Sequence, residues 1–181
     1  MKIISYPDRS EWKELLSRPA MEVEGLYERV RTVLDDVRLR GDSALKEYEQ
    51  LFDKVSLDSF AVSRAELDEA ETLVPAELRK AIDCAALNIS KFHRAQIPAP
   101  LKVETTPGVV CRQKAVPITG VGLYIPGGTA PLFSTVLMLA VPARIAGCSE
   151  IILCTPPESD GRINPAILYA ARVAGVDRLF K

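Results

Sequence analysis

The sequence GVGLYIPGGTAPLFS, residues 120–134, joins a predicted strand to a predicted helix. Residues 118–125 are rich in β-branched and other apolar side chains and lead into a Pro-Gly turn, which is typical of a strand. The apolar residues that follow predict a helix over about residues 132–146, and Gly147 ends it because glycine readily adopts the left-handed conformation of a helix C-terminus. Upstream, residues 109–111 predict another short strand.

The glycine-rich turn in this stretch has the properties of a ligand-binding loop. Gly127 and Gly128 allow the backbone to approach a ligand closely, and the first turn of the following helix presents free N–H groups to a phosphate. Tyr124 ends the strand, where its ring is placed to stack on a base or its hydroxyl to bond a ribose. Gly120, Gly122 and Gly127 lack the spacing of the G-x-G-x-x-G fingerprint, so nucleotide binding and a plain strand-to-helix turn are both open readings of these residues.

Strands and helices alternate after this stretch. Residues 150–154 form a short apolar run that is typical of a buried parallel strand. Residues 165–174 predict a helix ended by Gly175, and residues 177–180 begin a third strand. The order predicts a βαβαβ unit of the α/β class, whose parallel sheet is normally covered on both faces. Because the sequence ends at Lys181, we expect an open apolar sheet edge beside the third strand.

The first hundred residues differ in composition from the rest. They carry 34 charged residues against 13 in residues 101–181, and the proline-rich stretch 97–100 separates the two parts. We therefore expect a helical segment over residues 1–100 and an α/β domain over residues 101–181. Apolar residues at steps of three and four predict a first amphipathic helix, which ends at Gly41 and carries Val23, Leu26, Val30, Val33, Leu34 and Val37.

Three more helices are predicted in this first part. Asp42 caps one helix, which includes Phe52, and Ser63 with Glu66 forms a capping box for the next. Residues 75–95 carry apolar side chains along one face and predict the third. We expect these helices to pack together as an antiparallel assembly.

The overall composition excludes several functional classes. The 181 residues carry a net charge of −1 and show no basic face, which argues against binding to nucleic acid or to a membrane surface. The N-terminus lacks an apolar signal core, and prolines and polar residues interrupt the longest apolar run, residues 130–143, so we expect a cytoplasmic protein. The four cysteines form no C-x-x-C pair and are expected to be reduced and mostly buried.

Taken alone, the residues indicate no catalytic set. His93 is the only histidine, and near the end of a helix it is interpreted as a solvated side chain rather than as a base. One histidine and scattered cysteines do not make a zinc site. Ser134 and Thr135 are expected to cap the helix after the glycine-rich turn, with a ligand contact as the alternative. A cysteine nucleophile beside one of the strands is a further, weaker alternative.

Several segments resemble the histidinol dehydrogenase family in sequence, order and spacing. They are RGDSALKEYEQLFDK (40–54), NISKFHRAQ (88–96), VETTPGVVCRQKAVPITGVGLYIPGG (103–128), VGLYIPGGTAPLFSTVLMLAVPARIAGC (121–148) and EIILCTPP (150–157). The resemblance covers nearly the whole chain. It implies that residues 101–181 are the first half of an incomplete, Rossmann-like nucleotide-binding domain. It also implies a dimeric, NAD-dependent and zinc-dependent oxidoreductase of histidine biosynthesis, which oxidises L-histidinol through the aldehyde to L-histidine.

The resemblance assigns site residues as well. Family members use the tyrosine of a Y-I-P-G-G motif for NAD, which corresponds to Tyr124 here. Pro126, Gly127 and Gly128 would then lie along the cofactor, and Ser134 would face the substrate cleft.

Other functional parts of the family have no matching motif in these residues. Family members are more than twice as long, and their zinc ligands, their catalytic base and a further NAD-binding loop of V-G-G-A-Q-A type cannot be assigned to any residue here. We therefore expect the chain alone to be inactive, with NAD and L-histidinol bound by an intact homodimeric enzyme. The alternative is a short, non-catalytic binding or interaction module that keeps the same scaffold.

Overall fold

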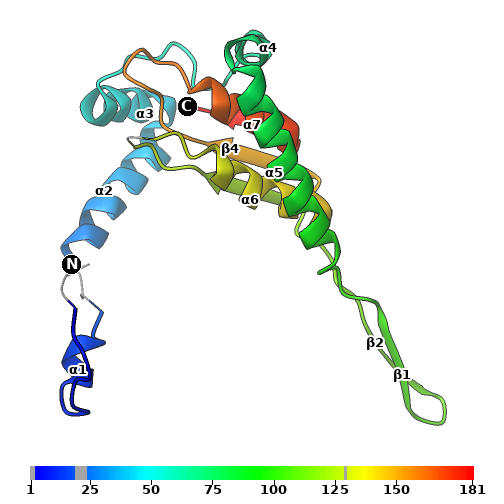
Figure 1. Ribbon diagram of the computed structural model, residues 1–181. Helices are drawn as coiled ribbons and strands as arrows, with labels where there is room; N and C mark the ends of the chain where they lie inside the picture. The colour runs from blue at the N-terminus through cyan, green and yellow to red at the C-terminus, as the bar shows by residue number, and fades with distance from the viewer. Residues whose placement is uncertain (1–2, 19–23, 129) are drawn as a thin grey trace. The chain divides into compact units, whose positions relative to one another are not determined.

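The computed structural model describes residues 3–18, 24–128 and 130–181, which form two compact units, Met1–Leu45 and Lys46–Lys181 (Figure 1). The first unit contains α1 (Trp12–Leu15), α2 (Glu24–Arg40) and the start of α3 (Asp42–Tyr48). The predicted stop at Gly41 is confirmed, since α2 ends at Arg40 and Gly41 has φ +59°. Val23, predicted as part of the apolar stripe, lies outside the described residues.

The second unit contains the remaining helices and all the strands of the described residues. Its elements are η1, a π-helix (Glu49–Asp53), α4 (Arg64–Leu73), α5 (Ala76–Arg94), β1 (Leu101–Thr106), β2 (Val109–Gln113), β3 (Gly120–Tyr124), α6 (Phe133–Ala146), β4 (Glu150–Cys154), α7 (Pro165–Ala174) and β5 (Arg178–Phe180). The predicted capping box is confirmed, because Ser63 and Glu66 satisfy each other's backbone N–H groups at the start of α4. The predicted helix from Asp42 to Phe52 is instead α3 followed by η1, which ends where Lys54 adopts a left-handed conformation.

The sheet formed by β3, β4 and β5 is parallel, as the βαβαβ pattern predicts, and its strand order is β3-β4-β5. Ile151 and Leu153 of β4 and Leu179 of β5 are buried in one apolar core with residues of α4, α5, α6 and α7. The alternate residues of β3, Val121 and Leu123, are half-buried against the same core. The residues between them point to the other face, where Tyr124 and Cys154 are exposed. Helices of the described residues therefore cover one face of the sheet and not the expected two.

Helices α4 and α5 pack on this α/β part. Helix α4 contacts α7, and α5 contacts both α6 and α7. Buried side chains of α4 and α5, Ala70 and Ile82, belong to the same core as Leu153 of β4. These two helices therefore help to enclose the sheet, although the sequence places them before the predicted boundary at residue 100.

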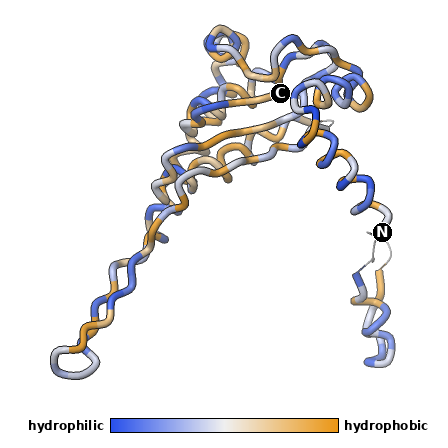
Figure 2. Tube along the Cα trace, turned by 180° about the vertical axis from the view of Figure 1, so that it is seen from behind, coloured by the Kyte–Doolittle hydropathy of each residue, from blue (hydrophilic) through white to orange (hydrophobic). Residues whose placement is uncertain are grey.

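A β-hairpin, β1 and β2, is separate from the parallel sheet (Figure 1). The strand predicted at residues 109–111 is part of it and pairs in antiparallel fashion with β1, which the sequence pattern did not reveal. Gly108 has φ +85° at the turn. Every residue of both strands is exposed, including the apolar side chains of Leu101 and Val103. Apolar and polar segments alternate along this uncovered hairpin (Figure 2).

The expected open edge beside the third strand is wrong, because residues 60–62 cover the outer edge of β5. The Val62 N–H donates to the Leu179 carbonyl at 2.9 Å, and the Lys181 N–H donates to the Phe60 carbonyl at 2.8 Å. The Lys181 ammonium also lies 2.6 Å from the Glu66 carboxylate. Burial opposes ionisation of Glu66, but hydrogen bonds from Lys181 and Ser63 outweigh it and hold the pKa of this carboxyl below its ordinary value.

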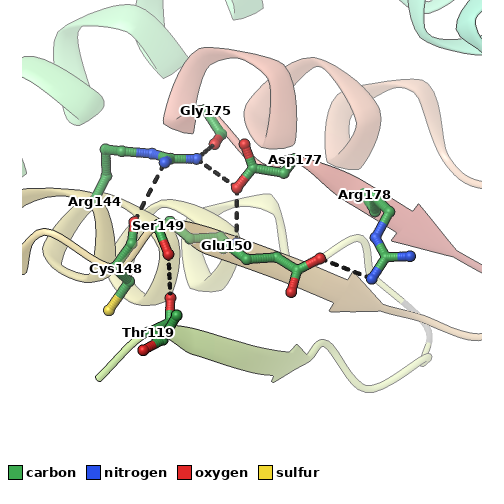
Figure 3. A network of polar contacts seen from close by, with 9 residues as sticks. Thr119, Arg144, Cys148, Ser149, Glu150, Gly175, Asp177 and Arg178 are labelled. Atoms are coloured by element: carbon green, nitrogen blue, oxygen red, sulfur yellow. Dashed lines mark hydrogen bonds and ion pairs between the residues drawn. The ribbon is translucent and has the colours of Figure 1, made fainter. Parts of the chain in front are cut away.

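A network of polar contacts lies at the amino-terminal ends of β4 and β5 (Figure 3). Asp177 Oδ2 accepts a hydrogen bond from the Ile151 N–H at 2.7 Å and pairs with Arg144 at 2.8 Å. Arg144, in the last turn of α6, also donates to the Gly175 carbonyl at the end of α7. One carboxylate and one guanidinium thus tie both crossover helices to β4.

Replacing Asp177 by asparagine should lower the free energy of unfolding at neutral pH. The Ile151 N–H, helped by Arg144 and opposed by burial, holds the pKa of Asp177 below its ordinary value of 3.8. Its ionised form therefore stabilises the folded chain above the unfolded pKa, and this contribution is lost as the pH falls through the lower folded pKa. Denaturant unfolding at a series of pH values should show wild type and Asp177→Asn converging in acid. Asp68→Asn, which removes an exposed carboxylate from α4, serves as the control. A difference that stays constant with pH would contradict this role of the Asp177 charge.

Candidate functional site

A cleft of about 290 Å³ lies at the carboxyl ends of β3 and β4. Two loops line it, one between β3 and α6 and one between β4 and α7. The first loop contributes Pro126, Gly127 and Gly128, and the second contributes Pro156, Glu158 and Asn164. This is the edge at which open α/β sheets bind ligands, because the loops after neighbouring parallel strands meet there.

The two loops are held against each other closely. The Ile125 N–H donates to the Cys154 carbonyl at 2.9 Å, which extends the β3–β4 pairing by one residue, and the Ile125 side chain is fully buried. A Cβ atom on Gly127 would lie 2.7 Å from Cγ of Pro156, a separation that real Cβ atoms essentially never show. Only glycine fits at position 127, whereas a Cβ on Gly128 would meet no atom within 4 Å.

Both crossover helices begin at this cleft. Helix α6 has Leu132 as its N-cap residue and no side-chain cap. The prediction that Ser134 and Thr135 cap α6 is therefore wrong, since both lie inside its first turn, after the N-cap position. Helix α7 is capped by Asn164, whose Oδ1 accepts a hydrogen bond from the Ala166 N–H at 3.0 Å. The uncapped start of α6 leaves the positive end of its dipole available to an anion.

The structure brings together three of the four residues predicted to contact a cofactor. Pro126, Gly127 and Gly128 line the cleft, while Tyr124 ends β3 just before it, with its side chain 63% exposed and Cys154 opposite it in register. Ser134 is exposed in the first turn of α6 and is not one of the residues that line the cleft.

The second loop of the cleft was missed by sequence reasoning. Pro156, Glu158 and Asn164 follow a strand that was predicted correctly, but no glycine motif marks them. The predicted topology could have identified them, because the loops that follow neighbouring parallel strands lie at the same edge of a sheet.

The other candidate residues lie apart from the cleft. His93 is half-buried near the end of α5 and lines a different cavity of about 400 Å³. The described residues hold no group of three or more histidine, cysteine or acidic side chains placed for a metal ion. No helix in the described ranges combines the length and the apolar character of a bilayer span.

The cysteines are free thiols, and the expectation that most are buried is wrong. Cys148 is buried, whereas Cys84, Cys111 and Cys154 are exposed. Alternation along β4 explains Cys154, which lies on the uncovered face of the sheet, and Cys111 lies in the exposed hairpin. Partial desolvation of the Cys154 thiol nevertheless raises its pKa, which disfavours the thiolate that a cysteine nucleophile needs.

Comparison with known proteins gives consistent matches over the whole chain. A family model described as histidinol dehydrogenase matches residues 16–181. The histidinol dehydrogenase of Bacteroides fragilis (strain ATCC 25285) is 59% identical over 100% of this chain and 42% of its own length. That of Xanthomonas axonopodis pv. citri is 52% identical over 100% of this chain and 43% of its own length.

A solved structure agrees with these sequence matches. The crystal structure of histidinol dehydrogenase from Elizabethkingia anophelis superposes with a TM-score of 0.92 at 50% identity. The superposition covers 97% of this chain and 40% of the chain in the crystal. The present chain thus spans about two fifths of the length of the relatives it matches.

Proposed function

The chain belongs to the histidinol dehydrogenase family, and on that premise we propose that its cleft forms one part of the NAD site of an enzyme that oxidises L-histidinol through the aldehyde to L-histidine. Because the chain spans 42% of the length of a curated relative, the reaction is proposed for the intact enzyme. The chain alone is proposed to be inactive.

The cleft at the ends of β3 and β4 is the observation that supports this proposal. Its first loop has glycine at two successive positions, and the second of these leaves open space where a side chain would stand. A pyrophosphate can approach backbone N–H groups closely at such a position, and the uncapped start of α6 favours its negative charge. The described residues therefore fit the cofactor. When bound, NAD supplies the acceptor for the hydride that leaves the substrate carbon.

Each candidate residue has a role that follows from its position. Gly127 keeps the two loops in contact by lacking a Cβ, and Pro126 and Gly128 line the path of the cofactor. Tyr124 offers an exposed ring for stacking and a hydroxyl for a ribose. Ser134, exposed at the start of α6, is proposed to face the substrate.

Zinc does not fit the residues that the structure describes. Their single histidine, His93, lines another cavity, and no cluster of ligands surrounds it. The residues of this chain are therefore given no zinc chemistry, and the zinc ligands are proposed to lie in the part of the family's length that this chain does not span.

The setting of the enzyme follows from the same family membership. We propose a homodimer in the cytoplasm that acts in histidine biosynthesis. The free thiols are consistent with a reducing compartment, and the net charge of −1 gives no reason to expect nucleic acid or membrane partners.

Replacing Tyr124 by alanine should raise the dissociation constant for NAD about tenfold, because the change removes an exposed stacking surface and a hydroxyl from the end of β3, two residues before the first residue that lines the cleft. Isothermal titration calorimetry of the chain with NAD measures this constant. Tyr27→Ala, which removes an exposed tyrosine from α2, is the matched control and should leave the constant unchanged. An unchanged constant in Tyr124→Ala would remove the cofactor role of Tyr124. Formation of reduced cofactor by the chain with L-histidinol would overturn its proposed inactivity.

A further inference from the structure

Glu158 places a carboxylate in the cleft beside the glycine-rich loop. It follows β4, the strand next to β3, and lines the same cleft as Gly127 and Gly128. An acidic side chain after the second strand of a dinucleotide-binding βαβ unit stands where the adenosine ribose lies. If the cofactor lies in this cleft as it does in such units, Glu158 is on the ribose side and not on the reacting side.

The loop that carries Glu158 is well fixed. The Glu158 N–H donates to the Arg162 carbonyl at 2.8 Å, and the Gly161 N–H donates to the Glu158 carbonyl at 2.8 Å. The side-chain Oε1 accepts a hydrogen bond from Asn164 Nδ2 at 3.1 Å, and Asn164 is itself fixed as the N-cap of α7. One carboxylate oxygen is thus held in place, which keeps the side chain oriented at low entropic cost when a ligand binds.

No cationic side chain neutralises this carboxylate among the residues the structure describes. Arg162, on the same loop, pairs with Glu69 of α4 instead. Asp160 is also on this loop, but it accepts a hydrogen bond from the Arg162 N–H at 2.9 Å and does not line the cleft. Glu158 therefore brings an uncompensated negative charge and a free acceptor oxygen to the cleft.

We propose that Glu158 selects NAD over NADP. Its carboxylate accepts hydrogen bonds from the hydroxyl groups of the adenosine ribose, and it repels the phosphate that replaces one of these hydroxyls in NADP. The inference rests on the proposed cofactor cleft, and it adds the residue that distinguishes a ribose hydroxyl from a phosphate. Asn164 lines the same cleft and acts as a positioning residue, since its amide donates to the Glu158 carboxylate.

Calorimetric titration of the chain with NAD and with NADP, at one fixed ionic strength, tests this proposal. Wild type should bind NAD at least about tenfold more tightly than NADP. Glu158→Gln, which keeps the shape of the side chain but removes the charge, should reduce this ratio about tenfold, mainly through tighter NADP binding. Asp160→Asn removes the same charge two residues away, outside the cleft, and should leave the ratio unchanged.

The outcomes separate this inference from the proposed function. If Glu158→Gln binds NAD and keeps the wild-type ratio, the ribose role fails while the cofactor cleft stands. If Asp160→Asn changes the ratio as much as Glu158→Gln, general surface charge explains the preference and the role of Glu158 is overturned. Wild type that binds neither nucleotide would overturn both proposals.

Discussion

Gly127→Ala is expected to lower the free energy of unfolding by about 1–3 kcal/mol and to weaken NAD binding more than about tenfold. The new Cβ would lie 2.7 Å from Cγ of Pro156, an atom of a ring that is bonded to the backbone at both ends and so cannot swing away as a flexible side chain can. The two loops of the cleft must therefore move apart. Because both loops line the cleft, the same displacement that costs stability also changes the shape of the proposed cofactor site.

The neighbouring glycine supplies the control. A Cβ on Gly128 meets no atom within 4 Å, so Gly128→Ala should leave the free energy of unfolding close to that of wild type. Denaturant unfolding of the two variants and calorimetry with NAD measure both effects. Equal stability of Gly127→Ala and Gly128→Ala would show that the contact with Pro156 does not restrict position 127.

Leu137→Ala is expected to lower the free energy of unfolding by about 2–5 kcal/mol, because it leaves a cavity in a packed core. Leu137 is fully buried in α6, in the core that also contains Ile151 and Leu153 of the central strand. Met138→Ala is the matched control, since Met138 is the next residue of the same helix and is 51% exposed. Urea unfolding of both variants gives the comparison. A loss in Leu137→Ala no larger than in Met138→Ala would mean that α6 is not packed on the sheet as described.

The βαβαβ unit could be predicted from sequence because each of its elements carries its own local signal. Short apolar runs predicted β4 and β5, and glycines at positions 147 and 175, both with positive φ, ended α6 and α7 at the predicted residues. The capping box of Ser63 and Glu66 was equally local, since both partners lie within four residues. Patterns of this kind need no knowledge of the rest of the fold.

Features that depend on distant partners could not be predicted in the same way. Strand β1 is exposed along its whole length, so its conformation depends on pairing with β2 and not on burial of one face. The expected cap at Ser134 failed because α6 has Leu132 as its N-cap, which places Ser134 two residues further along, inside the first turn. The exposure of Cys154 depends on which face of the sheet the helices cover, and a single strand does not specify this.

Of the two loops that line the candidate site, only the first could be predicted from the sequence. The glycine-rich loop could be predicted because its two successive glycines are typical of a loop that binds a ligand. The loop with Glu158 and Asn164 contains no such motif. Their importance comes from the sheet order, which brings the end of β4 next to the end of β3.

The pairing of residues 60–62 with β5 has a consequence for how the second unit folds. Val62 and Leu179 stand near opposite ends of this unit along the chain, so their hydrogen bond closes a loop that contains almost all of it. Closing so long a loop costs more chain entropy than forming the β3–α6–β4 contacts, which join near neighbours in sequence. We therefore expect the β3–α6–β4 contacts to form first, and the pairing of residues 60–62 with β5 to form after the intervening chain has condensed. The second unit is therefore expected to finish folding only when residues 60–62 have paired with β5.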